Sequence, residues 1–461
     1  MATFSVEGQK VTVVGAARSG VAAALLLAGR GARVTLTDAH PSLHRAEDEA
    51  QLRRAGVSLE LGEHRPDTFN SADLLVLSPG VSLLQPQVAG ARRSGVAVMG
   101  EIELASRWLS GRIVAITGTK GKSTTTTLTG RMFTAGGRKA MVGGNIGTPL
   151  SSQVADSTPD TFHIVEVSSF QLETIDTFHP WVAVFLNLSP DHLDRHATFD
   201  EYARAKARIF ANQTENDWAV INADDPQVVA LAEDARAGRL MFSLEGTVSA
   251  GIAIRSDAIA DTRPGYETPL VPLSSIRLIG RHLIGDVMAA AAVARLAGIT
   301  ADAMTTAVES FSGLEHALEP VTTIGGVRFV NDSKATNVEA ARRAIESFDA
   351  GLVAIIGGRF KGGDLSLLAG PLRSRGATVV AIGEAQALIQ SALEGVVPVH
   401  AASSMSAAVR HAFTLAPVGG TVLLSPACAS FDMFRDYAER GQRFKQEVMR
   451  LAEEASTTRE Q

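Results

Sequence analysis

The residues Arg112-Ile-Val-Ala-Ile-Thr-Gly-Thr-Lys-Gly-Lys-Ser-Thr124 carry the strongest indication of fold in this chain. Residues 112–117 have the apolar, β-branched character of a buried strand, and a glycine loop and a helical run follow them. Glycines let backbone N–H groups surround an anion, and the N-terminus of the next helix adds a positive dipole. Lys122 could reach a terminal phosphate, and Ser123 could offer a hydroxyl to Mg²⁺. The loop is shorter than the full G-x-x-x-x-G-K-S/T pattern, but its setting favours an ATP site over a plain glycine turn.

The same strand–turn–helix pattern recurs along the chain. Short β-rich runs alternate with Ala- and Leu-rich helical stretches, which predicts an α/β fold with mostly parallel sheets. In the last third, strands are expected at residues 327–331, 352–358, 378–383 and 421–425. We expect domain boundaries near residues 108–112 and 315–320, and therefore domains 1–108, 109–316 and 317–461. The first and last are predicted to be Rossmann-like, and the middle one to resemble a P-loop ATPase.

Composition excludes several classes of protein. A chain of 461 residues predicts about three domains at roughly 150 residues each. Its 43 basic and 49 acidic residues leave a net charge of −6, so nucleic acid is not an expected partner. The single Cys428 excludes an internal disulfide and fits a reducing compartment. No apolar run reaches 18 residues and the first ten residues do not form a secretory signal, so we expect a cytoplasmic protein without membrane insertion.

A βαβ unit opens the chain. Its strands are expected at residues 11–14 and 33–38, and the turn between the first strand and the helix contains Ala17 where G-x-G-x-x-G has its middle glycine. This weakens an NAD interpretation but leaves two others open. Asp38 could accept hydrogen bonds from a ribose or base, or it could be an ordinary acid at a strand end. A further strand ends at Gly80, in a turn that could line the same crevice.

Three polar residues of the middle third have competing interpretations. Glu166 lies in a strand-like run and could bind Mg²⁺ beside the ATP phosphates, or it could be a solvent-exposed acid on an edge strand. His192 follows an apolar strand and could bind a metal. Its own segment slightly favours a surface histidine beside a helix-capping Asp191. Lys206 lies in a helical run, where a lysine is normally solvated.

Seven ordered motifs resemble those of the Mur ligases, the ATP-dependent amino-acid ligases of peptidoglycan synthesis, over essentially the whole chain. They are Gly118–Thr124, Gly143-Gly-Asn-Ile-Gly147, Glu166-Val-Ser-Ser-Phe-Gln-Leu-Glu173, Asp191-His-Leu-Asp194, Tyr202–Lys206, Asn331-Asp-Ser-Lys-Ala-Thr-Asn337 and Leu424-Ser-Pro-Ala-Cys-Ala-Ser-Phe-Asp432. The last two are most similar to the members that add D-glutamate. The resemblance implies that the chain joins D-glutamate to UDP-N-acetylmuramoyl-L-alanine through an acyl phosphate, with consequences for cell shape and division. It also implies a UDP-binding, an ATP-binding and an amino-acid-binding domain in this order.

The resemblance further implies a role for each matching residue. For the UDP-sugar these are Arg18, Ser19, Asp38, Gly80 and Asn145. For ATP they are Gly118, Thr119, Lys120, Gly121, Lys122, Ser123, Thr124, Asp332 and Lys334. For glutamate they are Thr336, Lys361, Ser430, Phe431 and Tyr437. One Mg²⁺ would bind Ser123 and Glu166, and a second would bind His192 and Lys206, the lysine acting through a carbamate formed from CO₂. Lys122, Glu166, His192 and Lys206 would be the catalytic residues, and the enzyme would be a monomer.

Four positions depart from the family pattern. Lys120 stands where the family commonly has asparagine, Leu283 and Asp286 replace two asparagines that contact the adenosine of ATP, and Ala317 replaces an arginine. Lys120 could supply the charge missing at Ala317. Two alternatives therefore remain: a ligase for L-glutamate or another amino acid, and a non-catalytic relative that binds a UDP-sugar. A folate-type polyglutamate ligase shares the central fold but leaves the N-terminal βαβ unit unexplained. Cys428 is expected to pack and not to react.

Overall fold

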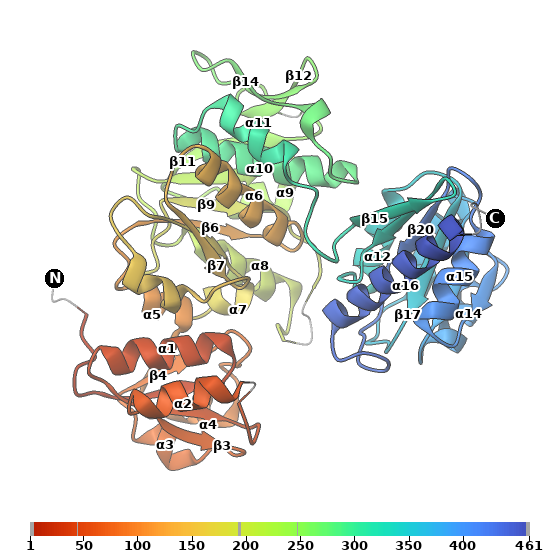
Figure 1. Ribbon diagram of the computed structural model, residues 1–461. Helices are drawn as coiled ribbons and strands as arrows, with labels where there is room; N and C mark the ends of the chain where they lie inside the picture. The colour runs from red at the N-terminus through yellow and green to blue at the C-terminus, as the bar shows by residue number, and fades with distance from the viewer. Residues whose placement is uncertain (1–3, 44, 192–194, 247, 458–461) are drawn as a thin grey trace. The chain divides into compact units, whose positions relative to one another are not determined.

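The computed structural model describes residues 4–43, 45–191, 195–246 and 248–457. The chain divides into two compact units, the first formed by residues 1–275 and 285–308 and the second by residues 276–284 and 309–461. The first unit contains two sheets and the second unit contains one (Figure 1). The expectation of an α/β fold with three mostly parallel sheets is confirmed. The boundaries near residues 108 and 316 remain predictions. No helix in the described ranges has the length and apolar character needed to cross a membrane.

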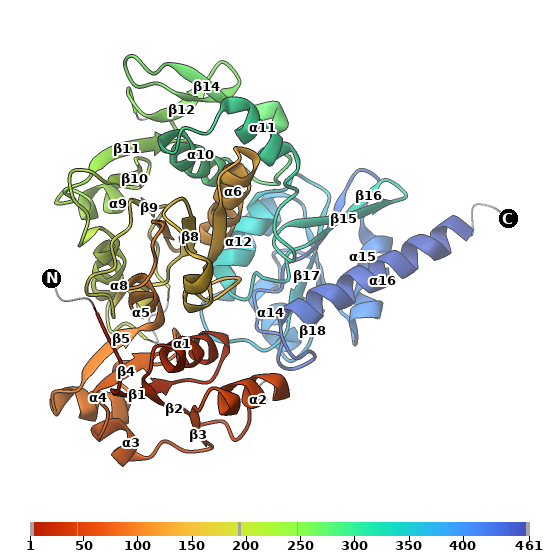
Figure 2. The same cartoon turned by 60° about the vertical axis from the view of Figure 1, so that its left-hand side comes forward.

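The N-terminal sheet has five parallel strands in the order β3-β2-β1-β4-β5. Its strands are β1 (Lys10–Val14), β2 (Arg33–Asp38), β3 (Ser58–Leu61), β4 (Leu74–Leu77) and β5 (Ala97–Gly100). Its helices are α1 (Arg18–Gly29), α2 (Ala46–Arg54), α3 (Pro66–Asn70), α4 (Pro86–Arg93) and α5 (Glu101–Ser106). Helices α1 and α2 lie on one face of the sheet and α3 and α4 on the other (Figure 2). Because Val14 is in register with Thr37 and Leu77, the loops after β1, β2 and β4 emerge together at one edge.

The central sheet has nine strands in the order β14-β13-β12-β11-β10-β9-β6-β8-β7, and only the pairs β12–β13 and β13–β14 are antiparallel. Its strands are β6 (Arg112–Thr117), β7 (Ala140–Gly144), β8 (Phe162–Glu166), β9 (Val182–Phe185), β10 (Trp218–Asn222), β11 (Gly238–Ser243), β12 (Ile252–Arg255), β13 (Ala258–Asp261) and β14 (Thr268–Pro272). Its helices are α6 (Lys122–Ala135), α7 (Ser169–Leu172), α8 (Phe199–Ala207), α9 (Pro226–Leu231), α10 (Arg281–Leu296) and α11 (Ala301–Glu309), with short 3₁₀ turns at Leu150–Asp156, Arg208–Phe210 and Leu273–Ser275. Residues Ile116 and Glu166 are in register, as are Thr117 and Phe185. The loops after β6, β8 and β9 therefore meet at the carboxyl edge of the sheet.

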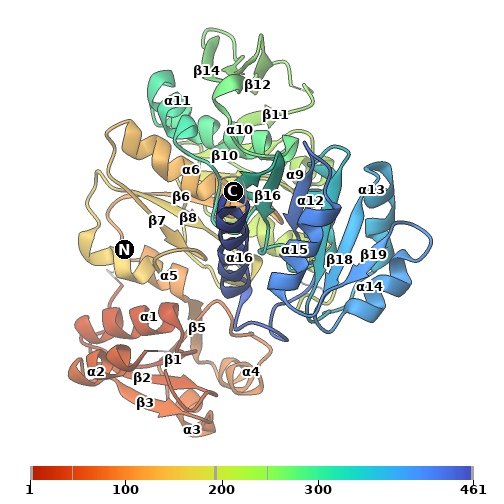
Figure 3. The same cartoon turned by 45° about the vertical axis from the view of Figure 1, so that its right-hand side comes forward.

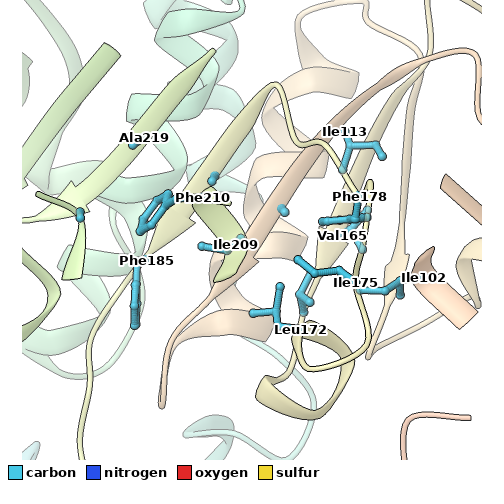
Figure 4. Close-up of a cluster of buried hydrophobic side chains, with 14 of the residues drawn as sticks. Ile102, Ile113, Val165, Leu172, Ile175, Phe178, Phe185, Ile209, Phe210 and Ala219 are labelled. Atoms are coloured by element: carbon cyan, nitrogen blue, oxygen red, sulfur yellow. The ribbon is translucent and has the colours of Figure 1, made fainter. Parts of the chain in front are cut away.

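A buried apolar cluster covers one face of the central sheet. Strand residues such as Ile113, Val165 and Phe185 pack there against residues of the following helices and turns, including Leu172 and Phe210 (Figure 4). Fully burying a side chain of this size stabilises the fold by roughly 1.5–3 kcal/mol relative to leaving it exposed. The cluster therefore fixes the strands of the central sheet against the helices and turns that follow them.

The C-terminal sheet has six strands in the order β15-β16-β20-β17-β18-β19, and only β15 and β16 pair antiparallel. Its strands are β15 (Glu319–Ile324), β16 (Val327–Asn331), β17 (Leu352–Gly357), β18 (Thr378–Ile382), β19 (Val399–Ala401) and β20 (Thr421–Leu424). Its helices are α12 (Val338–Glu346), α13 (Ala369–Ser374), α14 (Gln386–Leu393), α15 (Met405–Leu415) and α16 (Tyr437–Thr457), with a 3₁₀ turn at Leu365–Leu368. Helices α12, α13 and α14 pack on one face, and α15 and α16 on the other (Figure 3). The four strands expected in this region are all present.

Candidate active site

The loop between β6 and α6 requires glycine at two positions. Gly121 is the N-cap of α6 with a φ of 82°, and an added Cβ would lie 2.1 Å from Oδ1 of Asp286. Gly118 has a φ of 154°, and its Cβ would lie 2.9 Å from Cβ of Leu186. Both positions combine a backbone conformation that side chains rarely adopt with a lack of space. The buried Asp286, one of the departures from the family pattern, therefore lies against this loop. Residues 118–124 are called the phosphate loop below, after the ATP contacts predicted for them.

The end of β9 holds this loop in place. The backbone N–H of Lys120 donates to Oδ1 of Asn187 at 2.9 Å, and Nδ2 of Asn187 donates back to the Lys120 carbonyl at 3.0 Å. Nζ of Lys120 pairs with Asp191 at 3.3 Å, while Nζ of Lys122 donates to the carbonyl of Thr119 at 3.0 Å. Sequence reasoning did not assign a role to Asn187, and only its position after an apolar strand could have indicated one.

Glu166 lies at the centre of the polar cluster beside the phosphate loop. Its side chain is 2% exposed, and β8 lies between β6 and β7, so an exposed edge-strand acid is the wrong interpretation. Its carboxylate accepts hydrogen bonds from Oγ of Ser123 at 2.6 Å and from Nδ2 of Asn145 at 2.9 Å. Three residues expected at the site are thus in direct contact, although they come from three separate segments. A buried carboxylate beside a hydroxyl is a donor set that suits Mg²⁺, which prefers oxygen ligands.

Lys206 is buried beneath the same loop and is not a solvated lysine. It is 2% exposed, and its Nζ donates to the carbonyl of Gly118 at 2.8 Å. Burial lowers the pKa of Lys206 well below its ordinary value, and the nearby Lys122 acts in the same direction. The Nζ atom also lies 4.8 Å from the ring centre of Tyr202, whose hydroxyl contacts Oγ1 of Thr119 at 3.1 Å. Burial raises the pKa of Tyr202 to about 12, so it remains a neutral phenol.

The expected metal ligand His192 lies outside the described residues, as does Asp194. Among the residues that the structure describes, no group of three histidine, cysteine or acidic side chains is arranged to hold a metal. Arg195, just after this segment, donates to the carbonyls of Gly80 and Val81 at 3.0 and 2.8 Å. Its guanidinium also stacks over Phe170, 4.4 Å from the ring centre. Arg195 therefore attaches the loop after β4 to the segment after β9. The residues around Arg195 in the sequence do not indicate this role.

All five residues expected to bind the UDP-sugar line one pocket of about 400 Å³. They are Arg18, Ser19, Asp38, Gly80 and Asn145. Asp38 organises the pocket, because its carboxylate accepts hydrogen bonds from the backbone N–H of Ala16 at 2.6 Å and of His40 at 2.9 Å. Partial burial raises the pKa of Asp38, but these two donors together with the nearby His40 and His64 side chains outweigh it, and the net pKa is lowered. The acid at this strand end is therefore an ionised group that orders the turn.

The remaining expected residues lie in the second unit, on loops after adjacent strands. Asp332, Lys334 and Thr336 follow β16, Ser430 and Phe431 follow β20, and Lys361 follows β17. These strands are neighbours in the sheet, so the loops share one edge. Ser430 is buried, Lys361 and Phe431 are exposed, and Tyr437 begins α16. Burial raises the pKa of Asp332 to about 7, although Leu318 N–H and Ser425 Oγ donate to it at 3.1 Å each.

Three other positions of this unit were singled out by the sequence. Cys428 is fully buried in the core, and burial raises the pKa of its thiol to about 11, so the thiolate needed by a nucleophile is disfavoured. Ala317 lies between His316 and Leu318, which both have left-handed backbone conformations. Leu283 packs partly buried against the core of the same unit.

Three family models match the chain in order along its length. The N-terminal domain of the MurD-like Mur ligases matches residues 9–100, the Mur ligase middle domain matches residues 116–294, and the Mur ligase glutamate ligase domain matches residues 318–428. A solved structure, UDP-N-acetylmuramate-alanine ligase MurC from Thermotoga maritima, shares the fold with a TM-score of 0.60 at 17% identity, covering 96% of this chain and 99% of that one. The three family models, which together match most of the chain, define the class of protein as a Mur ligase.

Sequence relatives narrow the class. The UDP-N-acetylmuramoylalanine–D-glutamate ligase of Koribacter versatilis is 44% identical over 451 residues, which cover 98% of this chain and 99% of the relative. The ligase of the same name from Geotalea uraniireducens is 46% identical over 443 residues, 96% of this chain and 98% of the relative. The chain belongs to the Mur ligase family, in the branch formed by these D-glutamate ligases.

Proposed function

We propose that this protein is an ATP-dependent ligase that joins D-glutamate to UDP-N-acetylmuramoyl-L-alanine in the synthesis of peptidoglycan precursors. The observation that carries the proposal is the convergence of Ser123, Glu166 and Lys206 around one phosphate loop, in a chain similar over nearly its whole length to ligases of that name. The enzyme is proposed to act on small molecules in the cytoplasm, as a monomer and without nucleic acid.

The chemistry requires an activated acceptor. The acceptor carboxylate is a poor electrophile, and transfer of the γ-phosphoryl group of ATP converts it into an acyl phosphate. The amine of glutamate then attacks the carbonyl carbon, the tetrahedral species expels phosphate, and an amide, ADP and phosphate remain. Both steps develop negative charge on oxygens near the phosphates. Lys122 and the backbone N–H groups of the loop would stabilise this charge, and most of the catalysis would be positioning and electrostatics.

We also propose Mg²⁺ at two places. Ser123 and Glu166 would hold one ion, and His192 with a modified Lys206 would hold a second. A bound Mg²⁺ supplies charge neutralisation at the phosphate oxygens. The lowered pKa of Lys206 favours a neutral amine, which can add to CO₂ and release a proton to form a carbamate. The carbamate converts a buried amine into an oxygen ligand for the cation. Lys206 would then act as a catalytic residue with Lys122, Glu166 and His192.

The other expected residues divide between the three substrates. The pocket of the first unit would take the UDP-sugar through Arg18, Ser19, Asp38, Gly80 and Asn145. ATP would contact the phosphate loop from Gly118 to Thr124 together with Asp332 and Lys334. A dianionic amino acid needs cationic and hydroxyl donors, which Lys361, Thr336 and Ser430 would supply beside Phe431 and Tyr437.

A phosphate-release assay tests the proposed function. The full chain is incubated with UDP-N-acetylmuramoyl-L-alanine, ATP and Mg²⁺, and D-glutamate is compared with L-glutamate. We expect release that depends on D-glutamate and on the acceptor, and that falls at least about a hundredfold in Glu166→Gln because a buried charge near the reacting phosphates is lost. Glu215→Gln, on the loop before β10, is the control and should retain activity. Phosphate release with L-glutamate alone would show that L-glutamate, and not D-glutamate, is the substrate. No release with either amino acid would favour a non-catalytic relative.

A further inference from the structure

The loop of residues 332–336 is held from several sides by strained backbone. Five non-glycine residues of the described ranges have a positive φ, and two of them, Ser256 and Asp257, form the turn between β12 and β13. The other three are His316, Leu318 and Ala427, with φ values of 65°, 46° and 58°. Positive φ values in side-chain-bearing residues are uncommon and persist only where the surroundings impose them.

All three strained residues make hydrogen bonds to this one loop. The carbonyl of His316 accepts from the backbone N–H of Lys334 at 2.9 Å, and the N–H of Leu318 donates to Oδ1 of Asp332 at 3.1 Å. The N–H of Ala427 donates to the carbonyl of Ala335 at 3.0 Å. The strain therefore coincides with contacts that shape a single short segment.

Arg440, in the first turn of α16, also forms hydrogen bonds with this loop. Its Nε donates to Oγ of Ser333 at 2.9 Å, its Nη2 donates to the carbonyl of Ser333 at 2.9 Å, and its Nη1 donates to the carbonyl of Cys428 at 3.0 Å. One guanidinium thus joins the loop after β16 to the loop after β20. Oγ of Ser333 in turn donates to the carbonyl of Tyr437 at 2.7 Å, which attaches the loop to the start of α16.

The burial of Arg440 is unusual for a side chain of this kind. It is 1% exposed, and no carboxylate of the described residues lies within ion-pair distance of it. Burial lowers its pKa only to about 10, so it is still charged at neutral pH. A buried cation without a carboxylate partner is costly, so its three hydrogen bonds must offset part of the cost of desolvation. The next residue, Gly441, also lacks space for a Cβ, which would lie 2.2 Å from Nδ1 of His316.

We propose that Arg440 is a positioning residue, whose planar fork of donors holds the 332–336 loop in the shape that receives ATP and the incoming amino acid. The inference rests on the proposed function, because Asp332 and Lys334 are the residues expected at the nucleotide and Thr336 is expected at glutamate. Arg440 acts on them through Ser333, which lies between Asp332 and Lys334. None of the contacts of Arg440 involves the UDP-sugar pocket. A change at Arg440 should therefore alter the binding of ATP and glutamate and leave the binding of the UDP-sugar unchanged.

The test compares Arg440→Lys with Arg443→Lys in the 461-residue chain. Lysine keeps the charge at position 440 but cannot reproduce three donors in one plane. We expect the KM for ATP and for D-glutamate to rise about tenfold in Arg440→Lys, as expected for the loss of one or two charge-assisted hydrogen bonds. The KM for the UDP-sugar should stay within about twofold of the wild-type value. Arg443, one turn further along α16 and paired with the neighbouring Glu447, is the matched control and should show no change. Equal changes in all three KM values, or in none, would refute a positioning role.

Amide hydrogen exchange provides a second readout that does not depend on activity. Peptides covering residues 331–337 should exchange faster in Arg440→Lys than in the wild-type protein or in Arg443→Lys, while peptides from β17 and β18 should not change. Unchanged exchange at 331–337 would overturn the proposal. If Arg440→Lys does not fold, Ser333→Ala, which deletes only the acceptor of Nε and the donor to Tyr437, must show the same pattern to a smaller extent. A wild-type enzyme without D-glutamate-dependent phosphate release would refute the proposed function, whereas the exchange measurement would still decide the role of Arg440.

Discussion

Lys206 illustrates how far burial can change the chemistry of one side chain. On an isolated helix a lysine carries a solvated ammonium, but here the amine lies under the phosphate loop with a carbonyl of Gly118 as its close acceptor. Desolvation disfavours the charged form and lowers the pKa, so a neutral and nucleophilic amine becomes accessible. This is the condition that carbamate formation requires, since only the unprotonated amine adds to CO₂.

The proposed carbamylation of Lys206 can be tested directly. Protein equilibrated with ¹³C-bicarbonate should show a carbamate carbon resonance that disappears in Lys206→Arg, because a guanidinium does not form the adduct under these conditions. Lys139→Arg, a change of an exposed lysine, should leave the resonance in place. Phosphate release should also fall when CO₂ is removed from the buffer and recover on its return. A resonance that persists in Lys206→Arg would contradict the assignment.

Asp332 should make the stability of the second unit depend on pH. Burial raises its pKa in the folded protein to about 7, from an ordinary value of 3.8. The folded state therefore retains a proton that the unfolded chain has lost, so the contribution of Asp332 to stability is fully present below pH 4 and is lost as the pH rises to about 7. The contribution is at most about 4 kcal/mol.

The substitution Asp332→Asn should remove this pH dependence. Urea unfolding of the ligand-free protein between pH 5 and pH 8 should show a shallower loss of stability for Asp332→Asn than for the wild type. The exposed Asp349→Asn is the matched control and should follow the wild-type curve. Parallel curves for all three proteins would show that Asp332 does not hold its proton in the folded state.

Helix α6 has a glycine with a positive φ near each end, and the space around these two glycines differs. At the N-terminal end, Gly121 has a positive φ and Asp286 lies against it. At the C-terminal end, Gly137 has a φ of 70° but open space around it. A side chain at Gly137 therefore meets only backbone strain, whereas one at Gly121 also displaces a buried carboxylate.

Alanine substitutions at Gly137 and Gly121 should distinguish a loss of stability from a loss of ATP binding. Gly137→Ala should cost about 1–2 kcal/mol of stability and retain ATP binding. Gly121→Ala should weaken ATP binding at least about tenfold, because the loop must move away from Asp286 and its N–H groups lose their common direction. Calorimetric titration with ATP and Mg²⁺, together with the melting temperature of each variant, measures both effects. Equal ATP affinity in the two variants would contradict this account of the loop.

The whole molecule consists of two compact units, and the pocket around Asp38 that we propose for the UDP-sugar is lined only by residues of the first. A ligand that binds only one unit stabilises that unit by mass action, by about 2.7 kcal/mol when its concentration is a hundred times the Kd. The two units should therefore respond differently to UDP.

Scanning calorimetry with and without UDP tests this expectation. We expect UDP to raise the transition of the first unit and to leave that of the second unchanged. Asp38→Ala should abolish the shift, because it removes the carboxylate that accepts from Ala16 and His40. Asp67→Ala, which changes an exposed acid on α3 of the same domain, should retain it. A shift of the second transition alone would place UDP outside this pocket.

Much of the fold and part of the site could be predicted from local patterns. The strand and glycine loop at residues 112–121, the strand of Glu166 and the four expected strands of the last third depend on side-chain periodicity and turn chemistry within short segments. Motif order then indicated the family. For isolated residues the patterns were weaker: the helical run of Lys206 favoured a solvated lysine, and the strand of Glu166 left an exposed acid possible.

The contacts that give these residues their chemistry depend on the packing of distant segments. Neighbouring residues do not indicate that Lys206 lies beneath Gly118, that Asp286 limits the space at Gly121, or that Arg195 attaches the loop of Gly80 to the central domain. Arg440 reaches Ser333 across more than a hundred residues of sequence, and the left-handed backbone at Ala427 arises where two loops meet. Periodicity specifies which face of a strand or helix is apolar, and this is a local property of the chain. The protonation state of a lysine or the role of an arginine depends on the dielectric and the partners around it, and these exist only once the sheets and their loops have packed together.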